Sequence, residues 1–281
     1  MSLKAENLEH KYNAGTTLEA YALKGINLEI DKGEFVGLIG RTGSGKSTLV
    51  QHFNGLLKPT GGRILFDGKD ISEKGFSLKL LRQHVGLVFQ YPEYQLFEET
   101  VIKDVAFGPL NKGLKRDEAC KMAHEALKLV GIQEELYNKS PFELSGGQKR
   151  RVAVAGVLAI HPEYLILDEP TAGLDPEGRE AILGLFKSLH ERLGITVIMV
   201  SHSMEDVARY AKRLIVMNEG SIAYDDTPRK VFEHVEELES MGLSAPQSVH
   251  IAHALKLAGY DVPEDAITVD ELVKPVIDSM K

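Results

Sequence analysis

The sequence predicts an α/β fold built on a mainly parallel β-sheet covered by helices. Two observations lead to this expectation. Short apolar runs, the pattern of strands buried on both faces, occur at 35–39, 85–89, 164–167, 196–200 and 214–217. Helix-forming segments separate these runs, the clearest at 176–193. Alternation of strand and helix favours parallel strands joined by helical crossovers.

The N-terminal part adds a small antiparallel β subdomain. Apolar and polar residues alternate from Leu3 to Tyr12, and the strand-like run 26–30 ends in a turn at 31–33. A hairpin region begins at Gly61 and Gly62, and its turn is formed by Asp67 and Gly68. Between these pieces, strand 35–39 runs into a glycine-rich turn and then into helix formers from residue 46.

Two helical regions lie outside this alternating core. Residues from about 91 to 160 are mainly helical, with 118–130 as the clearest amphipathic helix and Gly131 as its C-terminal cap. After Ser221, three short helices are expected. The first is capped by Thr227 and Pro228 and ends at Gly242, the second ends at 259, and the third starts with a capping box at 268–271. Their apolar residues are Val231, Val235 and Leu238, then Ile251, Leu255 and Ala258, then Leu272, Val276 and Met280.

Composition excludes several classes of protein. A chain of 281 residues is long enough for a full α/β core, and its net charge of −8 predicts no nucleic-acid partner. The single cysteine, Cys120, excludes a disulfide framework and favours a reducing compartment. The N-terminus lacks the pattern of a signal peptide, and the longest uncharged apolar stretch, 152–160, is far shorter than the roughly 20 residues of a membrane helix. Any role at a membrane is therefore expected to be peripheral.

Residues 40–48 have the sequence of a phosphate-binding loop. They fit G-x-x-x-x-G-K-[ST] between a buried strand and a helix, the context that the motif requires. Backbone N–H groups and the helix N-terminus attract phosphate, Lys46 neutralises β- and γ-phosphate oxygens, and the Ser47 hydroxyl binds Mg²⁺. The sequence therefore predicts a P-loop nucleotide-binding core. The predicted nucleotide contacts are Gly40, Arg41, Thr42, Gly43, Ser44, Gly45, Lys46, Ser47 and Thr48.

Strand 164–167 ends in two acids, Asp168 and Glu169. Since ligands bind at the carboxyl ends of parallel strands, Asp168 is placed to hold Mg²⁺ through water, and Glu169 to polarise the attacking water as general base. Such an ending is as often a solvated turn when it stands alone. Together with the phosphate-binding loop it predicts nucleotide hydrolysis.

A second segment suited to phosphate is Leu144-Ser-Gly-Gly-Gln148. Ser145 can cap the following helix, and Gly146 and Gly147 let a phosphate approach the backbone closely. A lone Ser-Gly-Gly is more often only a capped turn. In most P-loop enzymes the phosphates of one nucleotide contact a single helix N-terminus. A second helix N-terminus suited to phosphate in the same chain therefore requires an explanation.

Three further polar residues follow strands or turns near these motifs. Gln90 ends strand 85–89, His202 follows strand 196–200, and Asp175 ends the segment 172–175. Gln90 and His202 can share the sheet edge of Glu169. Each of the three is more often structural when it occurs alone.

Taken together, these residues resemble the ATPase subunit of ABC transporters over about residues 1–227, in order and spacing. The resemblance implies a RecA-like P-loop NTPase core, with ATP and Mg²⁺ as cofactors. Gln90 would sense Mg²⁺ and γ-phosphate and relay to a membrane partner, and His202 would steady the γ-phosphate and attacking water. Asp175 would couple two sites across a dimer, and Tyr12 would stack on adenine. In that family's head-to-tail dimer, the segment containing Ser145, Gly146, Gly147 and Gln148 contacts ATP bound to the opposite subunit.

A narrower resemblance is to the energy-coupling-factor importers, carried by residues 90–109, 148–159 and 171–176. Those ATPases commonly have Asn where this chain has Tyr91. The resemblance implies a homodimer or heterodimer of ATPase chains, bound to integral membrane coupling and substrate-binding subunits on the cytoplasmic side of the cell membrane. Cobalt or nickel ions are the leading cargo, with vitamins as the alternative. Residues 1–229 would form the ATPase domain, with a helical subdomain at about 91–160, and residues 230–281 a dimerising extension.

Three alternatives remain open from sequence. The first is a soluble P-loop kinase or GTPase. The Ser145 segment would have no function in a kinase, and residues 138–141 do not fit the GTPase motif Asn-Lys-x-Asp. Non-transport ABC ATPases that act on DNA or ribosomes carry long coiled-coil insertions or a second ATPase half, and this sequence has neither. A conventional binding-protein-dependent importer differs only near 95–97 and in the C-terminal helices. The expected docking surface for a membrane partner contains Tyr91, Tyr94 and Phe97, which could instead pack within the helical subdomain.

Overall fold

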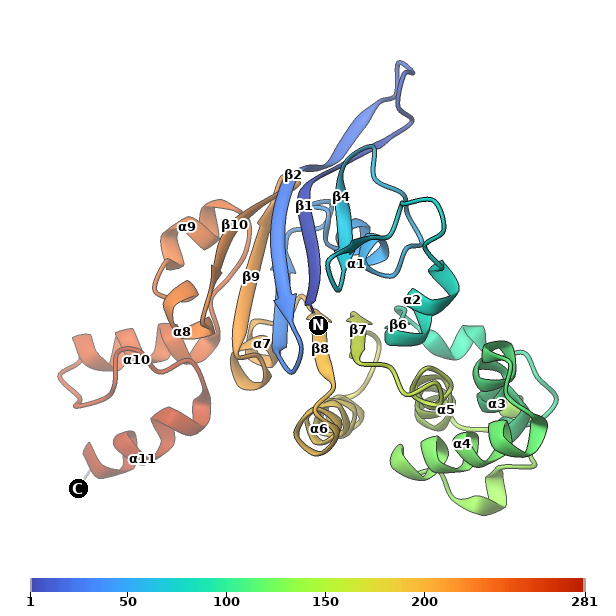
Figure 1. Ribbon diagram of the computed structural model, residues 1–281. Helices are drawn as coiled ribbons and strands as arrows, with labels where there is room; N and C mark the ends of the chain where they lie inside the picture. The colour runs from blue at the N-terminus through green and yellow to red at the C-terminus, as the bar shows by residue number, and fades with distance from the viewer. Residues whose placement is uncertain (1, 280–281) are drawn as a thin grey trace.

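The computed structural model describes residues 2–279 (Figure 1). A six-stranded sheet in the order β10-β9-β3-β8-β7-β6 forms the centre, and a four-stranded sheet in the order β2-β1-β4-β5 lies beside it. Met280, assigned above to the third C-terminal helix, lies outside the described residues. The predicted α/β fold, with an antiparallel N-terminal sheet, a parallel central sheet and covering helices, is confirmed.

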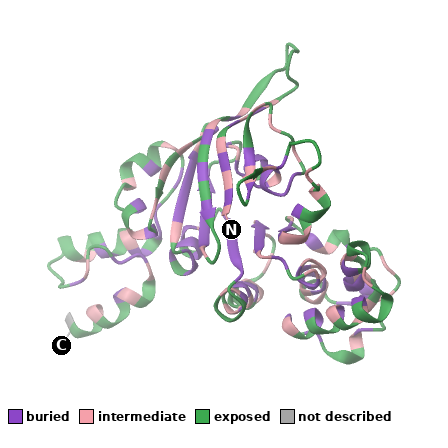
Figure 2. Ribbon diagram, viewed as in Figure 1, coloured by how far each residue is buried: buried purple, intermediate pink, exposed green. Residues whose placement is uncertain are grey.

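The central sheet contains all five strands predicted from the apolar runs. Its strands are β3 (Phe35–Gly40), β6 (Val85–Val88), β7 (Tyr164–Asp168), β8 (Thr196–Val200), β9 (Arg213–Asn218) and β10 (Ser221–Asp226). All neighbours pair in parallel except β9 and β10, which are antiparallel. Strand β10 was not predicted, because only its alternate residues are half-buried and it lacks an apolar run. Every residue of β3, β7 and β8 is buried, as Figure 2 shows.

Alternate residues of the central strands serve two different cores. Val36 and Leu38 of β3 face the antiparallel sheet, together with Leu49 and Phe53 of α1 (Lys46–Phe53). The antiparallel sheet consists of β1 (Ser2–Tyr12), β2 (Ala20–Asp31), β4 (Gly61–Phe66) and β5 (Lys69–Asp70). Strand β2 begins six residues before the predicted run, since its first part pairs with the end of β1 although only Leu23 of that part is buried. The helix that follows the phosphate-binding loop is thus fixed between two sheets.

The opposite face of the central sheet is covered by helices. Here lie α6 (Pro176–Leu193), with the bounds predicted from sequence, and α7 (Met204–Tyr210), which was not predicted. The short α2 (Leu78–His84) precedes β6 and was also not predicted. The helical subdomain contains α3 (Val101–Lys112), α4 (Arg116–Leu129), α5 (Gly146–Leu158) and the 3₁₀ turns Pro92–Gln95, Glu134–Leu136 and Pro141–Glu143. Gly131 follows the end of α4 with φ of 74°, as expected for a glycine that ends a helix.

The C-terminal helices differ from the prediction in three details. They are α8 (Pro228–Val231), α9 (Val235–Ser240), α10 (Gln247–Leu257) and α11 (Val269–Ser279). The predicted single helix from 228 to 242 is wrong, because the chain turns where Phe232 enters the main core. Ile251 is 47 % exposed, and Ala252 and Ser248 form the buried face of α10 instead. The Glu271 carboxylate accepts a hydrogen bond from Ile267 N at 2.8 Å rather than from the backbone of residue 268.

The last helices have a small core of their own, formed by Ala252, Val262, Ala266 and Leu272. In the part of the chain that the structure describes, we find no helix with the length and apolar character to span a membrane.

Candidate functional site

The phosphate-binding loop lies between β3 and α1 and is closed around its own lysine. Lys46 is only 5 % exposed, and its Nζ donates hydrogen bonds to Gly40 O at 2.6 Å and Arg41 O at 3.2 Å. Gly45 caps α1 with φ of 101°, and a Cβ there would lie 2.4 Å from Ala22 O, so no other residue fits. Burial lowers the pKa of Lys46, with Glu169 and Asp168 opposing this effect. The loop therefore presents a buried cation whose hydrogen-bond partners, among residues 2–279, are neutral carbonyl oxygens.

Several features of this loop fit a bound phosphate chain. The first turn of α1 contains no acidic residue, so its N-terminal N–H groups and dipole offer an uncompensated positive end. The Ser44 hydroxyl is buried with no hydrogen-bond partner among the described residues. Phosphate oxygens would supply the acceptors that the buried ammonium, the hydroxyl and the backbone N–H groups require.

Asp168 ends β7 directly opposite the first turn of α1. It is 8 % exposed, and its Oδ1 accepts a hydrogen bond from Ser47 Oγ at 3.4 Å. Burial raises the pKa of Asp168, and the Ser47 hydrogen bond and the Lys46 charge act against this rise. A hydroxyl and a carboxylate side by side are oxygen ligands of the kind that Mg²⁺ uses together with phosphate oxygens. These two side chains, with the Gln90 amide bonded to the adjacent Glu169, are suited to hold Mg²⁺, which would supply positive charge to phosphate oxygens.

The Glu169 carboxylate is held from both sides at the end of the central sheet. Its Oε1 pairs with His202 Nε2 at 2.7 Å, and its Oε2 accepts from Gln90 Nε2 at 3.0 Å. These three residues follow β7, β8 and β6, the adjacent strands whose carboxyl ends meet at this edge. Glu169 has φ of 52°, a left-handed backbone that is uncommon for a glutamate and typical of functional turns. The three predicted catalytic residues are therefore brought together.

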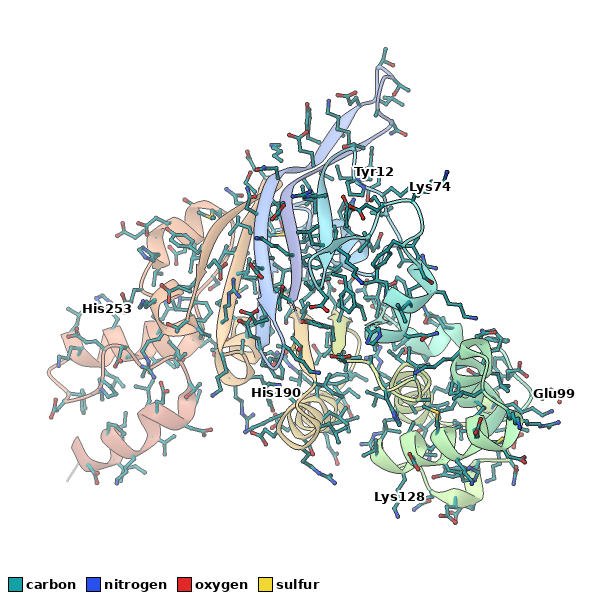
Figure 3. The ribbon with its side chains drawn as sticks, viewed as in Figure 1. Tyr12, Lys74, Glu99, Lys128, His190 and His253 are labelled. Atoms are coloured by element: carbon teal, nitrogen blue, oxygen red, sulfur yellow. The ribbon has the colours of Figure 1, made fainter. Side chains whose placement is uncertain are left out.

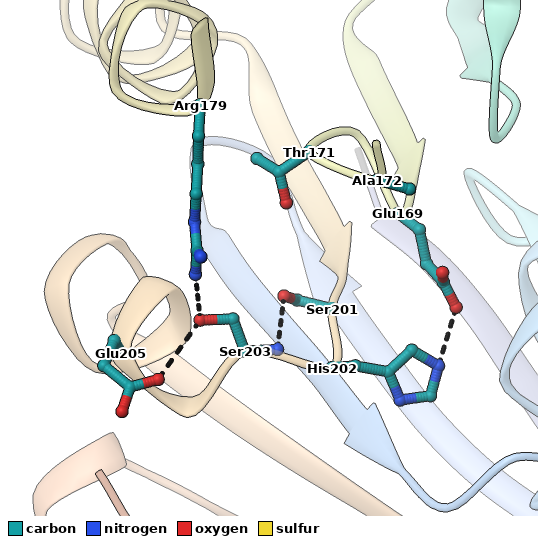
Figure 4. A pocket seen from close by; sticks show the side chains of 8 residues that line it. All are labelled: Glu169, Thr171, Ala172, Arg179, Ser201, His202, Ser203 and Glu205. Atoms are coloured by element: carbon teal, nitrogen blue, oxygen red, sulfur yellow. Dashed lines mark hydrogen bonds and ion pairs between the residues drawn. The ribbon is translucent and has the colours of Figure 1, made fainter. Parts of the chain in front are cut away.

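Beside Glu169 lies a cavity of about 360 Å³ (Figure 4). His202 and Glu169 face each other across one side, and Arg179 reaches Ser203 on the other. Arg179 also donates to both carboxylate oxygens of Asp206, from Nη2 to Oδ1 at 2.8 Å and from Nε to Oδ2 at 3.2 Å. Sequence reasoning missed Arg179 and Asp206, because an arginine and an aspartate 27 residues apart carry no motif.

Tyr12 lies next to the helix that follows the phosphate-binding loop, at the base of the arm that joins β1 and β2 (Figure 3). Its hydroxyl is 3.2 Å from Thr48 Oγ1, and the residue is 43 % exposed. Its inner side packs edge-on against His10, whose ring in turn contacts His52, with centroids 4.6 and 4.7 Å apart. An exposed aromatic face within reach of the loop fits the predicted adenine contact. The two buried histidines behind it were not predicted.

The Ser145 segment lies apart from this site in the same chain. Ser145 Oγ accepts from Gln148 N at 3.3 Å and Gln148 Oε1 accepts from Ser145 N at 2.9 Å, so the two form a capping box at the start of α5. Gly146 and Gly147 have open space where a Cβ would stand. Residues around this segment, Gly131, Gln133 and Arg151 among them, line a different hollow from that of Glu169.

Asp175 and the aromatic segment after Gln90 are the remaining features predicted from sequence. Asp175 caps α6, since its Oδ1 accepts from Gly178 N at 2.9 Å. Tyr94 and Phe97 are 84 % and 58 % exposed, while Tyr91 is 39 % exposed. The expectation of an exposed aromatic surface thus holds for Tyr94 and Phe97, and Tyr91 is partly packed.

The family model of ABC transporters matches residues 23–172, more than half of the chain. The chain belongs to the ABC transporter family. Of the family's characteristic residues, this match contains the phosphate-binding loop, Gln90, the Ser145 segment and the acids at 168 and 169. A nucleotide kinase or GTPase is thereby excluded, and the chain is an ABC ATPase.

Similar curated proteins place this ABC ATPase more narrowly. It is 55% identical to the energy-coupling factor transporter ATP-binding protein EcfA2 of Caldanaerobacter subterraneus subsp. tengcongensis, over 99% of this chain and 97% of that protein. It is also 55% identical to EcfA2 of Clostridium tetani, over 99% of this chain and 96% of that protein. The chain therefore belongs to the ATP-binding proteins of energy-coupling factor transporters, as the segment after Gln90 predicted.

Solved structures agree with this assignment. CbiO1 from Clostridium perfringens, described as part of the ABC transporter complex cbiONQ, has a TM-score of 0.74 and 46% identity, covering 85% of this chain and 93% of that chain. The ATP-binding cassette MJ0796, in a dimeric post-hydrolysis state bound to ADP and Pi, has a TM-score of 0.71 and 34% identity, covering 80% of this chain and 98% of that chain. The predicted P-loop NTPase fold is confirmed.

Proposed function

We propose that this ATPase hydrolyses MgATP at a site completed by a second ATPase chain, and thereby powers micronutrient import through membrane subunits. The observation that carries the proposal is the Glu169 carboxylate held between His202 and Gln90, at 2.7 and 3.0 Å, beside a buried lysine in a phosphate-binding loop. An acceptor fixed by two neighbours is suited to act on a single water.

The proposed chemistry follows from these positions. Lys46 and the N–H groups of the loop bind the β- and γ-phosphates. Ser47, Asp168 and Gln90 would hold Mg²⁺, which would supply positive charge to the phosphate oxygens. Glu169 takes a proton from the water that attacks the γ-phosphorus; the bond from the γ-phosphorus to the β–γ bridging oxygen breaks, and ADP leaves with that electron pair. His202 keeps Glu169 oriented and donates to the γ-phosphate. Little covalent chemistry is required of the protein, so positioning and charge account for the rate.

A second chain is proposed because the Ser145 segment has no role in its own chain's site. The start of α5 combines a capped N-terminus, two glycines and open space, as expected of a phosphate contact. In a head-to-tail pair, the Ser145, Gly146, Gly147 and Gln148 segment of one chain would cover ATP on the other, with Asp175 coupling the two sites. The dimeric MJ0796 structure supports such a pair, either homodimeric or heterodimeric for this chain.

The C-terminal extension, residues 230–281, is proposed to help hold the pair together. Helix α11 exposes Val269, Val273 and Ile277, which are spaced four residues apart and are 60 %, 48 % and 52 % exposed. Residues spaced in this way lie on one helical face, and a partner helix would remove that face from water.

Membrane subunits are proposed as the other partners, with this chain bound peripherally at the cytoplasmic side of the cell membrane. The names of the similar proteins support this, since they are subunits of energy-coupling factor or cbiONQ transporters. Tyr94 and Phe97 are the proposed anchors, because large exposed aromatic side chains bind well in apolar grooves. The proposed cargo is a transition-metal ion such as cobalt or nickel, with a vitamin as the alternative.

The test is purification of the tagged chain from membranes of its native cells, with identification of the bound proteins by mass spectrometry. Integral membrane proteins in fixed stoichiometry are expected, and Phe97→Asp should reduce their recovery at least tenfold. Leu18→Asp, at a site that is 74 % exposed on the β1–β2 arm, is the matched control and should leave recovery unchanged. Recovery with ribosomes or DNA, and no membrane protein, would contradict the proposal. Recovery with a separate extracellular binding protein would favour a conventional importer.

A further inference from the structure

One buried guanidinium joins three segments of the molecule that are far apart in sequence. Arg150 of α5 is 3 % exposed. Its Nε and Nη2 donate to the two oxygens of Glu93, each at 3.1 Å. Its Nη1 donates to Ala172 O at 2.9 Å and to Pro170 O at 3.3 Å. All three nitrogens are thus engaged, two with a carboxylate and one with backbone carbonyls.

The three segments are those that the proposed function assigns to different tasks. Glu93 belongs to the 3₁₀ turn Pro92–Gln95, which begins two residues after Gln90 and carries the exposed Tyr94. Pro170 and Ala172 form the turn directly after Glu169. Arg150 itself lies five residues after Ser145, in the helix whose start is the proposed contact to the second chain's ATP.

Aromatic packing connects the same segments a second time. The Tyr91 ring lies 5.9 Å from the Arg150 guanidinium and covers Gly173, where a Cβ would meet its Cε1 at 3.3 Å. Tyr91 has φ of 54° and Gly173 has φ of 72°, so both segments have left-handed backbones at the point where they touch. Any shift of the turn after Glu169 must therefore move Arg150, Tyr91 or both, because close-packed groups transmit displacement.

We propose that Arg150 is a positioning residue that transmits the state of the Glu169 turn to the exposed 91–95 segment. The inference rests on the proposed function. A change at the γ-phosphate would displace Glu169 and the carbonyl of Ala172, and Arg150 would pass this displacement to Glu93 and the neighbouring Tyr94. A lysine cannot replace Arg150, because one ammonium cannot hold both carboxylate oxygens and two carbonyls in a planar fork. By linkage, a partner that binds the 91–95 segment alters nucleotide affinity through the same residue.

The chain contains no tryptophan, so a single substitution provides a clean optical probe. Tyr94→Trp places an indole at a position that is 84 % exposed and next to Glu93. In the Tyr94→Trp protein, Mg²⁺ with a non-hydrolysable ATP analogue should shift the fluorescence emission of the indole relative to its emission with Mg²⁺ and ADP. Arg150→Lys should reduce the amplitude at least fivefold, while the Kd for the analogue stays within twofold, since Arg150 lies outside the loop that binds phosphate.

A second variant keeps the test decisive if Arg150→Lys folds poorly. Glu93→Gln leaves Arg150 and its bonds to the carbonyls in place and removes only the carboxylate end of the link, so it should also lower the amplitude. Glu99→Gln is the matched control (Glu99 is labelled in Figure 3): it breaks an exposed pair with Lys103 in the same region and should leave the amplitude unchanged.

Three results would overturn the inference. Full amplitude in both Arg150→Lys and Glu93→Gln would exclude the link. Loss of nucleotide affinity in parallel with amplitude would assign Arg150 a purely structural role. A Trp signal that does not respond to nucleotide even with Arg150 intact would mean that the 91–95 segment is not coupled to the site. None of these outcomes depends on a membrane partner, so they are distinct from a failed co-purification.

Discussion

Replacing the proposed general base, Glu169→Gln, separates binding of ATP from its hydrolysis. The amide has the size of the carboxylate and can keep the hydrogen-bonding distances to His202 and Gln90, 2.7 and 3.0 Å in the native protein, but it cannot accept a proton from water. A positioned general base contributes about 10²- to 10⁴-fold to the rate, or about 3–5 kcal/mol in the barrier. Phosphate release at saturating MgATP should fall by that factor.

The same variant should bind ATP normally and remain stable. The phosphate-binding loop and Lys46 are untouched, so the Kd for ATP should change less than threefold in calorimetry. The His202–Glu169 contact that it alters is partly exposed, with 45 % and 25 % of the two side chains accessible, and is worth less than about 1 kcal/mol. The variant should accumulate as an ATP-bound dimer in size-exclusion chromatography. Turnover within threefold of the native rate would refute the role of Glu169.

Three further predictions concern groups around the phosphates. Lys46→Ala should abolish ATP binding in calorimetry and raise the melting temperature of the nucleotide-free protein, because burial lowers the pKa of Lys46 and its charged form opposes folding at neutral pH; a lower melting temperature would contradict this. Burial raises the pKa of Asp168, so its carboxylate takes up a proton at a higher pH than an exposed aspartate does. The buried negative charge therefore destabilises the folded protein at high pH, and this destabilisation is lost as pH falls. Asp168→Asn should therefore raise the melting temperature at pH 8 more than at pH 4 and abolish Mg²⁺-dependent hydrolysis; equal shifts at both pH values would exclude this account. Tyr12→Ala should raise the KM for ATP about 5- to 20-fold with little change in kcat, whereas Tyr12→Phe, which loses only the Thr48 hydrogen bond, should change it less than threefold; an equal effect of both variants would exclude stacking.

Strands and helices were predictable where one physical signal dominated. The runs at 35–39 and 164–167 predicted strands because both of their faces are buried, and α6 was predicted because proline starts it and glycine ends it. Strand β10 was missed because burial alternates between exposed and half-buried, so no apolar run marks it. The turn at Phe232 was missed because a tertiary contact, rather than a local breaker, ends α8.

The candidate site divides in the same way. The chemistry of the phosphate-binding loop and the acids at 168 and 169 is local in sequence and could be predicted. Contacts between residues that are far apart could not be predicted, because nothing in the chain indicates that Arg150 meets Glu93, 57 positions away. The histidine pair behind Tyr12 was missed for the same reason, since single histidines carry no motif.

The central claim, that hydrolysis by this chain drives import, is tested most directly by uptake into vesicles. The native complex is reconstituted into vesicles with MgATP enclosed in the lumen, where it reaches the ATPase chains that face inward. Uptake into the lumen of labelled Co²⁺, Ni²⁺ and a panel of vitamins is then measured. One of these cargoes should accumulate with ATP and not with ADP, and Glu169→Gln should abolish the accumulation. Equal uptake by the native and Glu169→Gln complexes, or uptake without ATP, would contradict the claim.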